Sequence, residues 1–194
     1  MKEKKISSIK AELEILNASK LNKVSLAEWQ LFIQTYKEDE RSGVQKLIAT
    51  AQKRIEKYYA ELARTEELKK YEKEYDNYVY ICGVDEVGRG PLAGPVVAGA
   101  VILPKDCDIL YINDSKKLSA AKREELYEEI IEKAVAVELG MVGPERIDEI
   151  NILQATYEAM QQAIIKLTPQ PDLLLNDAVT IPKISIKQVP IIKG

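Results

Sequence analysis

Residues 81–104 have the sequence ICGVDEVGRGPLAGPVVAGAVILP, and the rest of the chain is arranged around them. Two apolar runs flank a turn rich in glycine and proline, which predicts adjoining strands over Tyr78–Val87 and Pro95–Pro104. Two acids, Asp85 and Glu86, stand near the end of the first run. Because burial of an unpaired carboxylate is unfavourable, we expect a divalent cation to compensate them, and oxygen-rich sites suit Mg²⁺ or Mn²⁺.

Downstream of this stretch, strand and helix patterns alternate along the chain. Pro190 would confine the last strand to a sheet edge. Three early strands followed by alternating helices and strands predict an α/β sheet with helices on its faces. The further strands are expected at 107–112, 135–142, 172–177 and 184–192, and the helices at 120–134 and 144–167, the second of these with Ile150, Leu153, Tyr157, Met160 and Ile164 inward.

Residues 1–75 have a different character, because their apolar side chains recur at helical spacing throughout. Ser25 and Glu28 have the spacing of a capping box before one of these helices. No proline occurs in this part, and Gly43 is its only glycine. We therefore expect an all-α N-terminal appendage over 1–75, followed by the α/β domain over 76–194.

The composition excludes several kinds of chemistry. The chain has 194 residues and no histidine, so it has no Ser-His-Asp triad, no Cys-His dyad and no histidine-ligated zinc. Its two cysteines do not suggest a disulfide framework. Any hydrolysis must therefore depend on carboxylates, metal ions and water. No apolar stretch approaches the roughly 20 residues of a membrane span, and the charged start lacks a signal-peptide core, so we expect a cytoplasmic protein with no membrane partner.

Charge is distributed unevenly along the chain. Residues 1–75 carry 16 Lys/Arg and 13 Asp/Glu, a net +3, and the remaining 12 Lys/Arg and 18 Asp/Glu give −6. A basic arm beside an acidic core is compatible with nucleic-acid binding, but solvated helix faces explain so small a difference equally well. Lysines and tyrosines also alternate over 53–59 and 69–73. This pattern suggests either nucleic-acid contacts or an amphipathic helix whose tyrosines face the core and whose lysines face solvent, and we favour the second.

The positions of the acids constrain how they could act together. Consecutive side chains of a regular strand point to opposite faces, so Asp85 and Glu86 cannot both face one metal from a strand interior, and we expect the strand to end or bulge at Val87–Gly90. Asp85 would then hold the cation through its side chain, and Glu86 would contribute either its carboxylate or only its carbonyl oxygen. Asp177 ends another apolar run and could meet Asp85 at the ends of neighbouring strands. It could also simply cap the turn that follows.

Several spaced motifs together resemble type 2 ribonuclease H (ribonuclease HII). They are GVDEVGRGPLAGPVVAGAVILP at 83–104, NDSKKLS at 113–119, IDEINILQAT at 147–156, PDLLLNDA at 171–178 and IIKG at 191–194. The resemblance implies a ribonuclease-H-like mixed sheet with flanking helices. It also implies cleavage of the RNA strand in RNA–DNA hybrids and at ribonucleotides embedded in duplex DNA. The implied two-metal mechanism leaves 5′-phosphate and 3′-hydroxyl ends and serves ribonucleotide excision repair.

The resemblance also assigns roles to individual residues. It makes Asp85, Glu86 and Asp177 the catalytic and metal-binding acids. A Gly-Arg-Gly turn is by itself an ordinary loop, but here it would contact the 2′-hydroxyl that distinguishes RNA from DNA. The loop before the helix at 120–134 would grip the substrate backbone. The implied substrate-binding residues are Gly88, Arg89, Gly90, Ser115, Lys116 and Lys117.

One departure from the family concerns the end of the chain. In the family, IIKG runs into an aspartate that completes a four-carboxylate site, whereas this sequence stops at Gly194. The resemblance therefore implies a C-terminally incomplete catalytic domain with weakened cleavage, and a monomer when full length. The alternative is a catalytically impaired, hybrid-binding fragment of such an enzyme.

Overall fold

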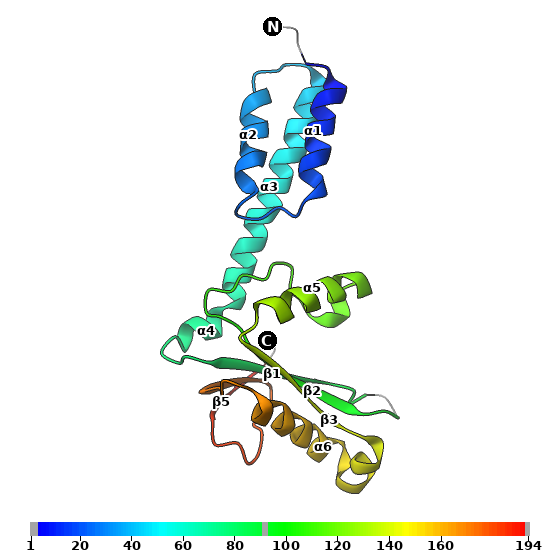
Figure 1. Ribbon diagram of the computed structural model, residues 1–194, viewed down its shortest axis with the longest axis vertical. Coiled ribbons are helices and arrows are strands. Elements are labelled where there is room, and N and C mark those ends of the chain that lie inside the picture. The colour runs from blue at the N-terminus through cyan, green and yellow to red at the C-terminus, as the bar shows by residue number, and fades with distance from the viewer. Residues whose placement is uncertain (1–3, 91–92, 193–194) are drawn as a thin grey trace. The chain divides into compact units, whose positions relative to one another are not determined.

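The computed structural model describes residues 4–90 and 93–192. The chain divides into two compact units, one up to Leu68 and one from Lys69 onward. The first is entirely helical and the second combines helices with a sheet (Figure 1). This confirms the predicted fold class of an α/β domain preceded by an all-α appendage. The predicted domain boundary between residues 75 and 76 stays a prediction.

The first unit is a bundle of three helices packed around one apolar core. Trp29 is fully buried at its centre, together with Phe32 from the same helix. The long third helix contributes Val44, Ile48 and other side chains at helical spacing, as the apolar periodicity predicted. The bundle consists of α1 (Ile6–Ala18), α2 (Leu26–Tyr36) and α3 (Ser42–Leu68).

The capping box expected at Ser25 is wrong. Ser25 has helical backbone angles, and its side chain makes no capping bond to α2. Instead the Ser25 hydroxyl accepts a hydrogen bond from the backbone N–H of Asn22 at 3.0 Å. Asn22 Oδ1 in turn accepts from the N–H groups of Val24 and Ser25, both at 2.9 Å. Asparagine side chains readily form such turns, so Asn22 organises this connection in place of the serine.

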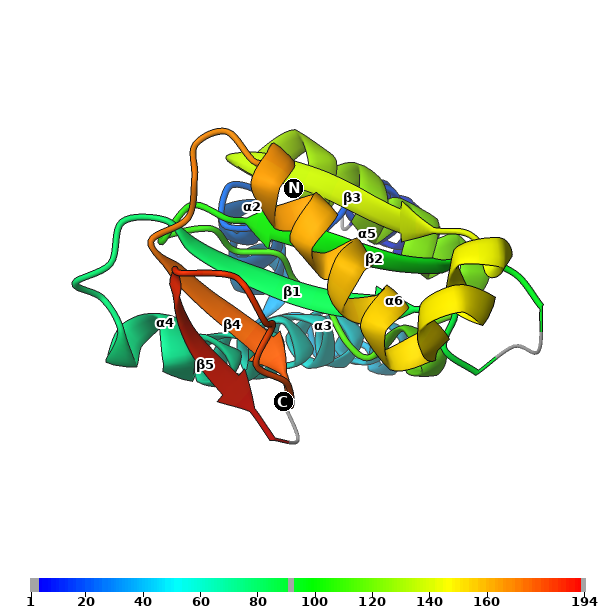
Figure 2. The ribbon, with the colours of Figure 1, turned by 90° about the horizontal axis from the view of Figure 1, so that it is seen from below.

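The second unit contains a five-stranded mixed sheet in the order β3-β2-β1-β4-β5 (Figure 2). The pairs β1–β2 and β2–β3 are antiparallel, whereas β1–β4 and β4–β5 are parallel. The predicted mixed sheet with flanking helices is thus confirmed. The elements of this unit are α4 (Lys70–Glu74), β1 (Ile81–Val87), β2 (Val96–Ile102), α5 (Ala120–Lys133), β3 (Ala136–Val142), α6 (Pro144–Lys166), β4 (Leu173–Asp177) and β5 (Lys187–Ile191), with a 3₁₀ turn at Ser115–Lys117.

Helix α6 lies across one face of the sheet and α5 lies on the opposite side (Figures 1 and 2). Contact between α6 and the sheet is unusually close at Gly140, where a Cβ atom would stand 1.9 Å from the carbonyl oxygen of Ala159. Small residues therefore dominate the buried face of α6. The prediction that Leu153 points inward is wrong, since it is 40% exposed. Asn151, with φ 69°, breaks the helical geometry and redirects the first turns of α6.

Two further expectations concern short segments. The strand predicted at Cys107–Ile112 is wrong, because this segment is a loop in which Tyr111 has a φ of 67°. Its apolar composition reflects burial, since Ile109 is 3% exposed. The expectation that Pro190 lies in an edge strand is confirmed by the terminal position of β5.

No helix within residues 4–90 and 93–192 is long and apolar enough to cross a membrane. Both cysteines, Cys82 and Cys107, are free thiols.

Candidate active site

Two of the three candidate acids come together at the carboxyl ends of two neighbouring interior strands, a place that we name the acidic sheet edge. Strands β1 and β4 are parallel and pair in register up to Val84 opposite Asn176. The next residue on each strand is the acid, Asp85 on β1 and Asp177 at the end of β4. Their proximity is visible in the electrostatics, because the charge of Asp177 acts on Asp85. The predicted convergence of strand ends therefore produces a pair of carboxylates.

Glu86 is placed differently. Strand β1 continues in regular register with β2 through Asp85, Glu86 and Val87, so the expected irregularity begins only after Val87. Side chains alternate along such a strand, and Asp85 and Glu86 therefore point to opposite faces. The Glu86 carboxylate is 15% exposed and accepts a hydrogen bond from Arg89 Nη1 at 3.0 Å. Of the two roles considered for Glu86, this geometry favours the one that uses its backbone carbonyl.

The carboxyl of Asp85 has a perturbed titration. Burial raises the pKa of Asp85, and the negative charges of Glu86 and Asp177 raise it further. The backbone N–H of Glu86, which donates to Asp85 Oδ1 at 2.7 Å, and the charge of Lys116 oppose this rise. The negative charges of Glu86 and Asp177, which contribute to this rise, are charges that a bound cation would offset.

These oxygen donors suit a hard cation, but they are few. Asp85 and Asp177 supply two carboxylates of the type that Mg²⁺ and Mn²⁺ prefer. Within residues 4–90 and 93–192 there is no group of three or more His, Cys, Asp or Glu side chains that could hold a metal ion. The two carboxylates therefore fit a site that is completed by backbone oxygen, water or substrate phosphate.

The loop before α5 brings a lysine to this edge. Asp114 accepts a hydrogen bond from the backbone N–H of Lys116 at 3.0 Å and so begins the 3₁₀ turn. Arg123 of α5 holds the turn by donating to the carbonyls of Ser115 at 3.1 Å and Leu118 at 2.8 Å. Lys116 is close enough to act electrostatically on Asp85. The neighbouring candidates Ser115 and Lys117 are exposed on the same turn.

The Gly-Arg-Gly turn directly follows β1, and its two glycines are not equivalent. Gly88 has a φ of +98°, and a Cβ atom there would stand 2.4 Å from the carbonyl oxygen of Pro95. A Cβ atom at Gly90 would meet no heavy atom of residues 4–90 and 93–192 within 4 Å, its chain neighbours aside. Arg89, between them, forms the ion pair with Glu86. Gly88 is thus required by the backbone itself, whereas the openness at Gly90 leaves room for another molecule.

A buried amide pair behind Asp177 was not anticipated from the sequence. Asn176 is fully buried, and its Nδ2 donates to Gln188 Oε1 at 2.8 Å and to the carbonyl of Val179 at 3.3 Å. Gln188 also bonds both backbone groups of Ile181, at 2.7 and 2.9 Å. The pair ties the end of β4 to the segment after Asp177 and to β5. A single polar residue between the leucines and Asp177 in LLLND was the available signal.

Comparisons with known proteins agree with this architecture in both parts of the chain. Residues 82–193 match the family model described as ribonuclease HII, and residues 5–76 match the ribonuclease HII N-terminal domain. Ribonuclease HII of Lachnoclostridium phytofermentans is 60% identical over 190 residues, covering 98% of this chain and 72% of the relative. Ribonuclease HII of Clostridioides difficile is 47% identical over 196 residues, covering 100% of this chain and 74% of the relative.

Among solved structures, ribonuclease H2 from Pyrococcus horikoshii OT3 aligns with a TM-score of 0.44 at 29% identity. The alignment covers 50% of this chain and 49% of that chain.

Proposed function

Because the chain belongs to the ribonuclease HII family, a family of hydrolases, we propose that it hydrolyses the RNA strand of RNA–DNA hybrids. We extend the proposal to single ribonucleotides embedded in duplex DNA, with a nick on the 5′ side of the ribonucleotide. The products would be a 5′-phosphate and a 3′-hydroxyl, and the activity would serve ribonucleotide removal and primer clearance. The observation that carries the proposal is the meeting of Asp85 and Asp177 at the ends of parallel strands, with Lys116 beside them.

The acids of this edge would hold divalent cations, Mg²⁺ or Mn²⁺. Asp85 and Asp177 would bind through their carboxylates, and Glu86 would take part through its backbone carbonyl while Arg89 holds its side chain. When bound, a pair of such ions supplies activation of the attacking water and stabilisation of the leaving 3′ oxygen. The raised pKa of Asp85 fits this role, since a cation favours the charged form of the carboxyl.

The remaining candidates would position the substrate. Lys116 brings positive charge next to Asp85 and would contact a phosphate, while Ser115 and Lys117 would contact the backbone further along. The open space at Gly90 would let the main chain approach the sugar and its 2′-hydroxyl. Arg89 would fix the turn through its ion pair with Glu86.

The second candidate function is hybrid binding with little or no cleavage. It is favoured by one observation, the absence of a group of three or more potential metal-ligating acids within the described residues. In this case the sheet edge would bind the duplex near a cation without efficient hydrolysis.

A cleavage assay separates the two functions. The substrate is a DNA duplex with one ribonucleotide, incubated with Mn²⁺ or Mg²⁺, and an all-DNA duplex of the same sequence is the substrate control. We expect a nick 5′ of the ribonucleotide. Asp85→Asn and Asp177→Asn should reduce the rate at least ~100-fold, or ~2.7 kcal/mol in barrier. Asp106→Asn, at an exposed acid outside the sheet edge, is the matched control and should change the rate less than about twofold.

Two results would contradict the proposal. Binding of the duplex without turnover would favour the second candidate. Activity of Asp85→Asn within about tenfold of the unchanged chain, ~1.4 kcal/mol, would remove Asp85 from the metal site.

A further inference from the structure

The solvent-facing side of α3 carries a line of lysines. Lys46, Lys53 and Lys57 are all exposed, and at 100° per residue they project within an arc of about 40°. We name these three residues the α3 basic stripe. Arg54 flanks them, and between Ser42 and Ala60 the only acid is Glu56, so this part of the helix carries four positive charges and one negative charge.

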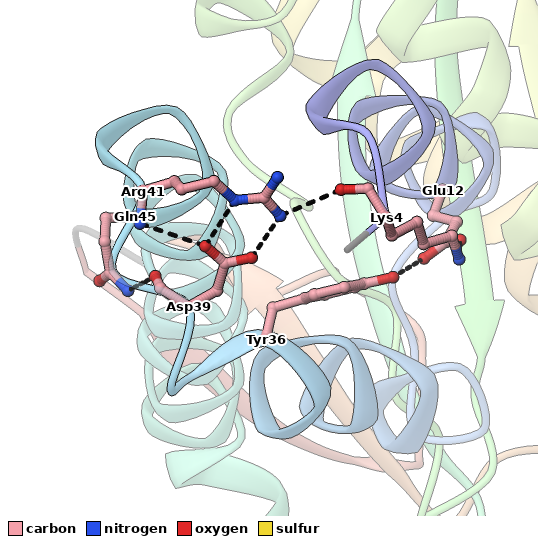
Figure 3. A network of polar contacts seen from close by, with 6 residues as sticks. All are labelled: Lys4, Glu12, Tyr36, Asp39, Arg41 and Gln45. Carbon is pink, nitrogen blue, oxygen red and sulfur yellow. Dashed lines mark hydrogen bonds and ion pairs between the residues drawn. The ribbon is translucent and has the colours of Figure 1, made fainter. Parts of the chain in front are cut away.

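Unlike several other cations of the bundle, the three lysines of the α3 basic stripe have no acidic partner among the described residues. Figure 3 shows Lys4 paired with Glu12, and Arg41 paired with Asp39 at 2.6 Å. Lys10 pairs with Glu14 at 3.6 Å, and Lys37 with Glu38 at 3.7 Å. Within residues 4–90 and 93–192, no ion pair and no hydrogen bond involves the side-chain ammonium groups of these three lysines. The Thr50 hydroxyl donates only to the backbone carbonyl of Lys46, at 2.8 Å. Their charge therefore remains available to an external anion.

The geometry points to one kind of anion. We propose that the α3 basic stripe contacts the phosphate backbone of a nucleic-acid duplex, as a binding surface separate from the acidic sheet edge. The helix is 27 residues long, and Lys46 and Lys57 stand about 16 Å apart along its axis. A straight, rigid row of charges of this length complements the regular row of phosphates along a duplex strand.

The surroundings of the stripe argue against other partners. Tyr58 is 2% exposed and belongs to the bundle core, so it offers no face for stacking on single-stranded bases. Tyr59 is 48% exposed but projects about 140° away from Lys46 around the helix, so it does not lie beside the stripe. Thr50 and Ala60 are the side chains nearest to the stripe, and neither provides the large apolar anchor of a protein interface or a membrane-inserted helix. Contacts of lysine with phosphate carry no sequence information, so binding should be independent of base sequence. This inference rests on the proposed function in one respect only, namely that the ligand is a nucleic-acid duplex.

Salt-dependent binding of the whole chain tests this surface. The stripe variant is Lys46→Gln/Lys53→Gln/Lys57→Gln, and the matched control, Lys5→Gln/Lys10→Gln/Lys37→Gln, removes the same charge from the same bundle. Affinity for an all-DNA duplex is measured by fluorescence anisotropy in EDTA over a salt series. Because each phosphate contact contributes about 0.9 to the slope of log K against log[salt], the stripe variant should lose about 2 to 3 of that slope, and the control should lose less than about 1.

Each outcome supports or overturns the proposal. Equal slopes in the stripe variant and the unchanged chain would overturn it, as would equal losses in the stripe variant and the control. A loss confined to single strands, or to vesicles of anionic phospholipid, would assign the lysines to another partner and also overturn it. Asp106→Asn, at an exposed acid outside the sheet edge, should keep the full slope. Since EDTA prevents cleavage, failure of the nuclease proposal would leave this result unaffected, and circular dichroism establishes that each variant is folded.

Discussion

The polar network of the helical bundle and the acidic edge of the sheet both contain carboxylates, but their surroundings have opposite effects. In the bundle, Glu12 accepts hydrogen bonds from Lys4 and from the hydroxyl of Tyr36, at 2.6 Å for the latter, and these bonds lower the pKa of Glu12 (Figure 3). At the sheet edge, burial and the charges of Glu86 and Asp177 raise the pKa of Asp85.

The opposite pKa shifts distinguish acids that stabilise the fold from acids whose role is to bind a ligand. A carboxylate with matched donors contributes to stability, whereas one beside other carboxylates opposes it in the absence of a cation. Such unfavourable clusters persist where a function requires them. The two regions should therefore respond oppositely to the same chemical change, the removal of one negative charge.

The largest expected effect lies within the sheet edge itself. Glu86→Gln should reduce cleavage by no more than about tenfold, ~1.4 kcal/mol, while Asp85→Asn should reduce it at least ~100-fold. The reason is that the Glu86 side chain pairs with Arg89 and its backbone carbonyl survives the substitution. Single-turnover cleavage of the ribonucleotide-containing duplex measures both. Equal losses would show that the Glu86 carboxylate turns toward Asp85 when cation and substrate bind.

The turn after these acids gives an intermediate effect. Gly88→Ala should lower the free energy of unfolding by about 1–3 kcal/mol, because it forces a side chain into a positive-φ position against Pro95. Gly90→Ala, the matched control, should change it by less than about 0.5 kcal/mol. Thermal melting followed by circular dichroism compares the two. If Gly90→Ala lowers cleavage of the ribonucleotide-containing duplex without lowering stability, the substrate occupies the space beside Gly90. Equal melting of both variants would disprove the distinction between the glycines.

The smallest expected effect is on stability, where removal of one negative charge should have opposite signs in the bundle and at the sheet edge. Glu12→Gln should destabilise the bundle by about 1 kcal/mol, the scale of an ion pair and a charged hydrogen bond near the surface. Trp29 is the single tryptophan and is buried in the bundle, so its fluorescence during urea unfolding reports on this unit. Glu14→Gln, at a more exposed ion pair, is the control and should cost less than about 0.5 kcal/mol. Asp85→Asn in EDTA should instead raise the melting temperature of the chain.

The pKa shifts of Glu12 and Asp85 also predict how the stability of the fold depends on pH. The folded-state pKa of Glu12 is lowered, so its contribution is complete above the unfolded pKa of about 4.3 and disappears as the pH falls through the folded value. The folded-state pKa of Asp85 is raised, so its unfavourable contribution is present at neutral pH and vanishes on acidification. Both variants should therefore converge on the unchanged chain at low pH, from opposite sides. Destabilisation by Asp85→Asn at pH 7 in EDTA would contradict this account.

Periodicity allowed most elements to be predicted from the sequence, because strands and helices here bury one regular face each. It failed where an apolar run was buried without pairing, as at Ile109 in the loop taken for a strand. On α6 it was right for Met160 and Ile164, which are buried, and wrong for Leu153, which is 40% exposed. It also missed the fully buried Ala155, Ala159 and Ala163. A Cβ atom at Gly140 would meet the backbone of Ala159, so only small side chains fit at this contact.

The candidate site was predictable to the extent that it depends on strand ends. The proximity of Asp85 and Asp177 followed from placing both acids at the carboxyl ends of neighbouring strands. The direction of the Glu86 side chain, toward the other face of the sheet, depends on whether β1 stays regular to Val87, and glycines in the following turn do not determine this. The bond between Asn176 and Gln188 joins residues on different strands. Asn176 stands out as a polar residue in LLLND, but one sequence without relatives does not indicate that its partner is Gln188.

The missing side chain at Gly140 has a consequence for motion. At Gly140 the backbone of β3 lies directly against that of α6, so at this point no side chain stands between them to rearrange. Helix and sheet should therefore shift together, as one rigid body, on any timescale short of unfolding. Adjustments that accompany substrate binding should fall to the turn at Gly88–Gly90 and the loop at Ser115–Lys117. Amide hydrogen exchange should reveal this division as slow exchange in β3 and the second half of α6, and fast exchange in those two connections.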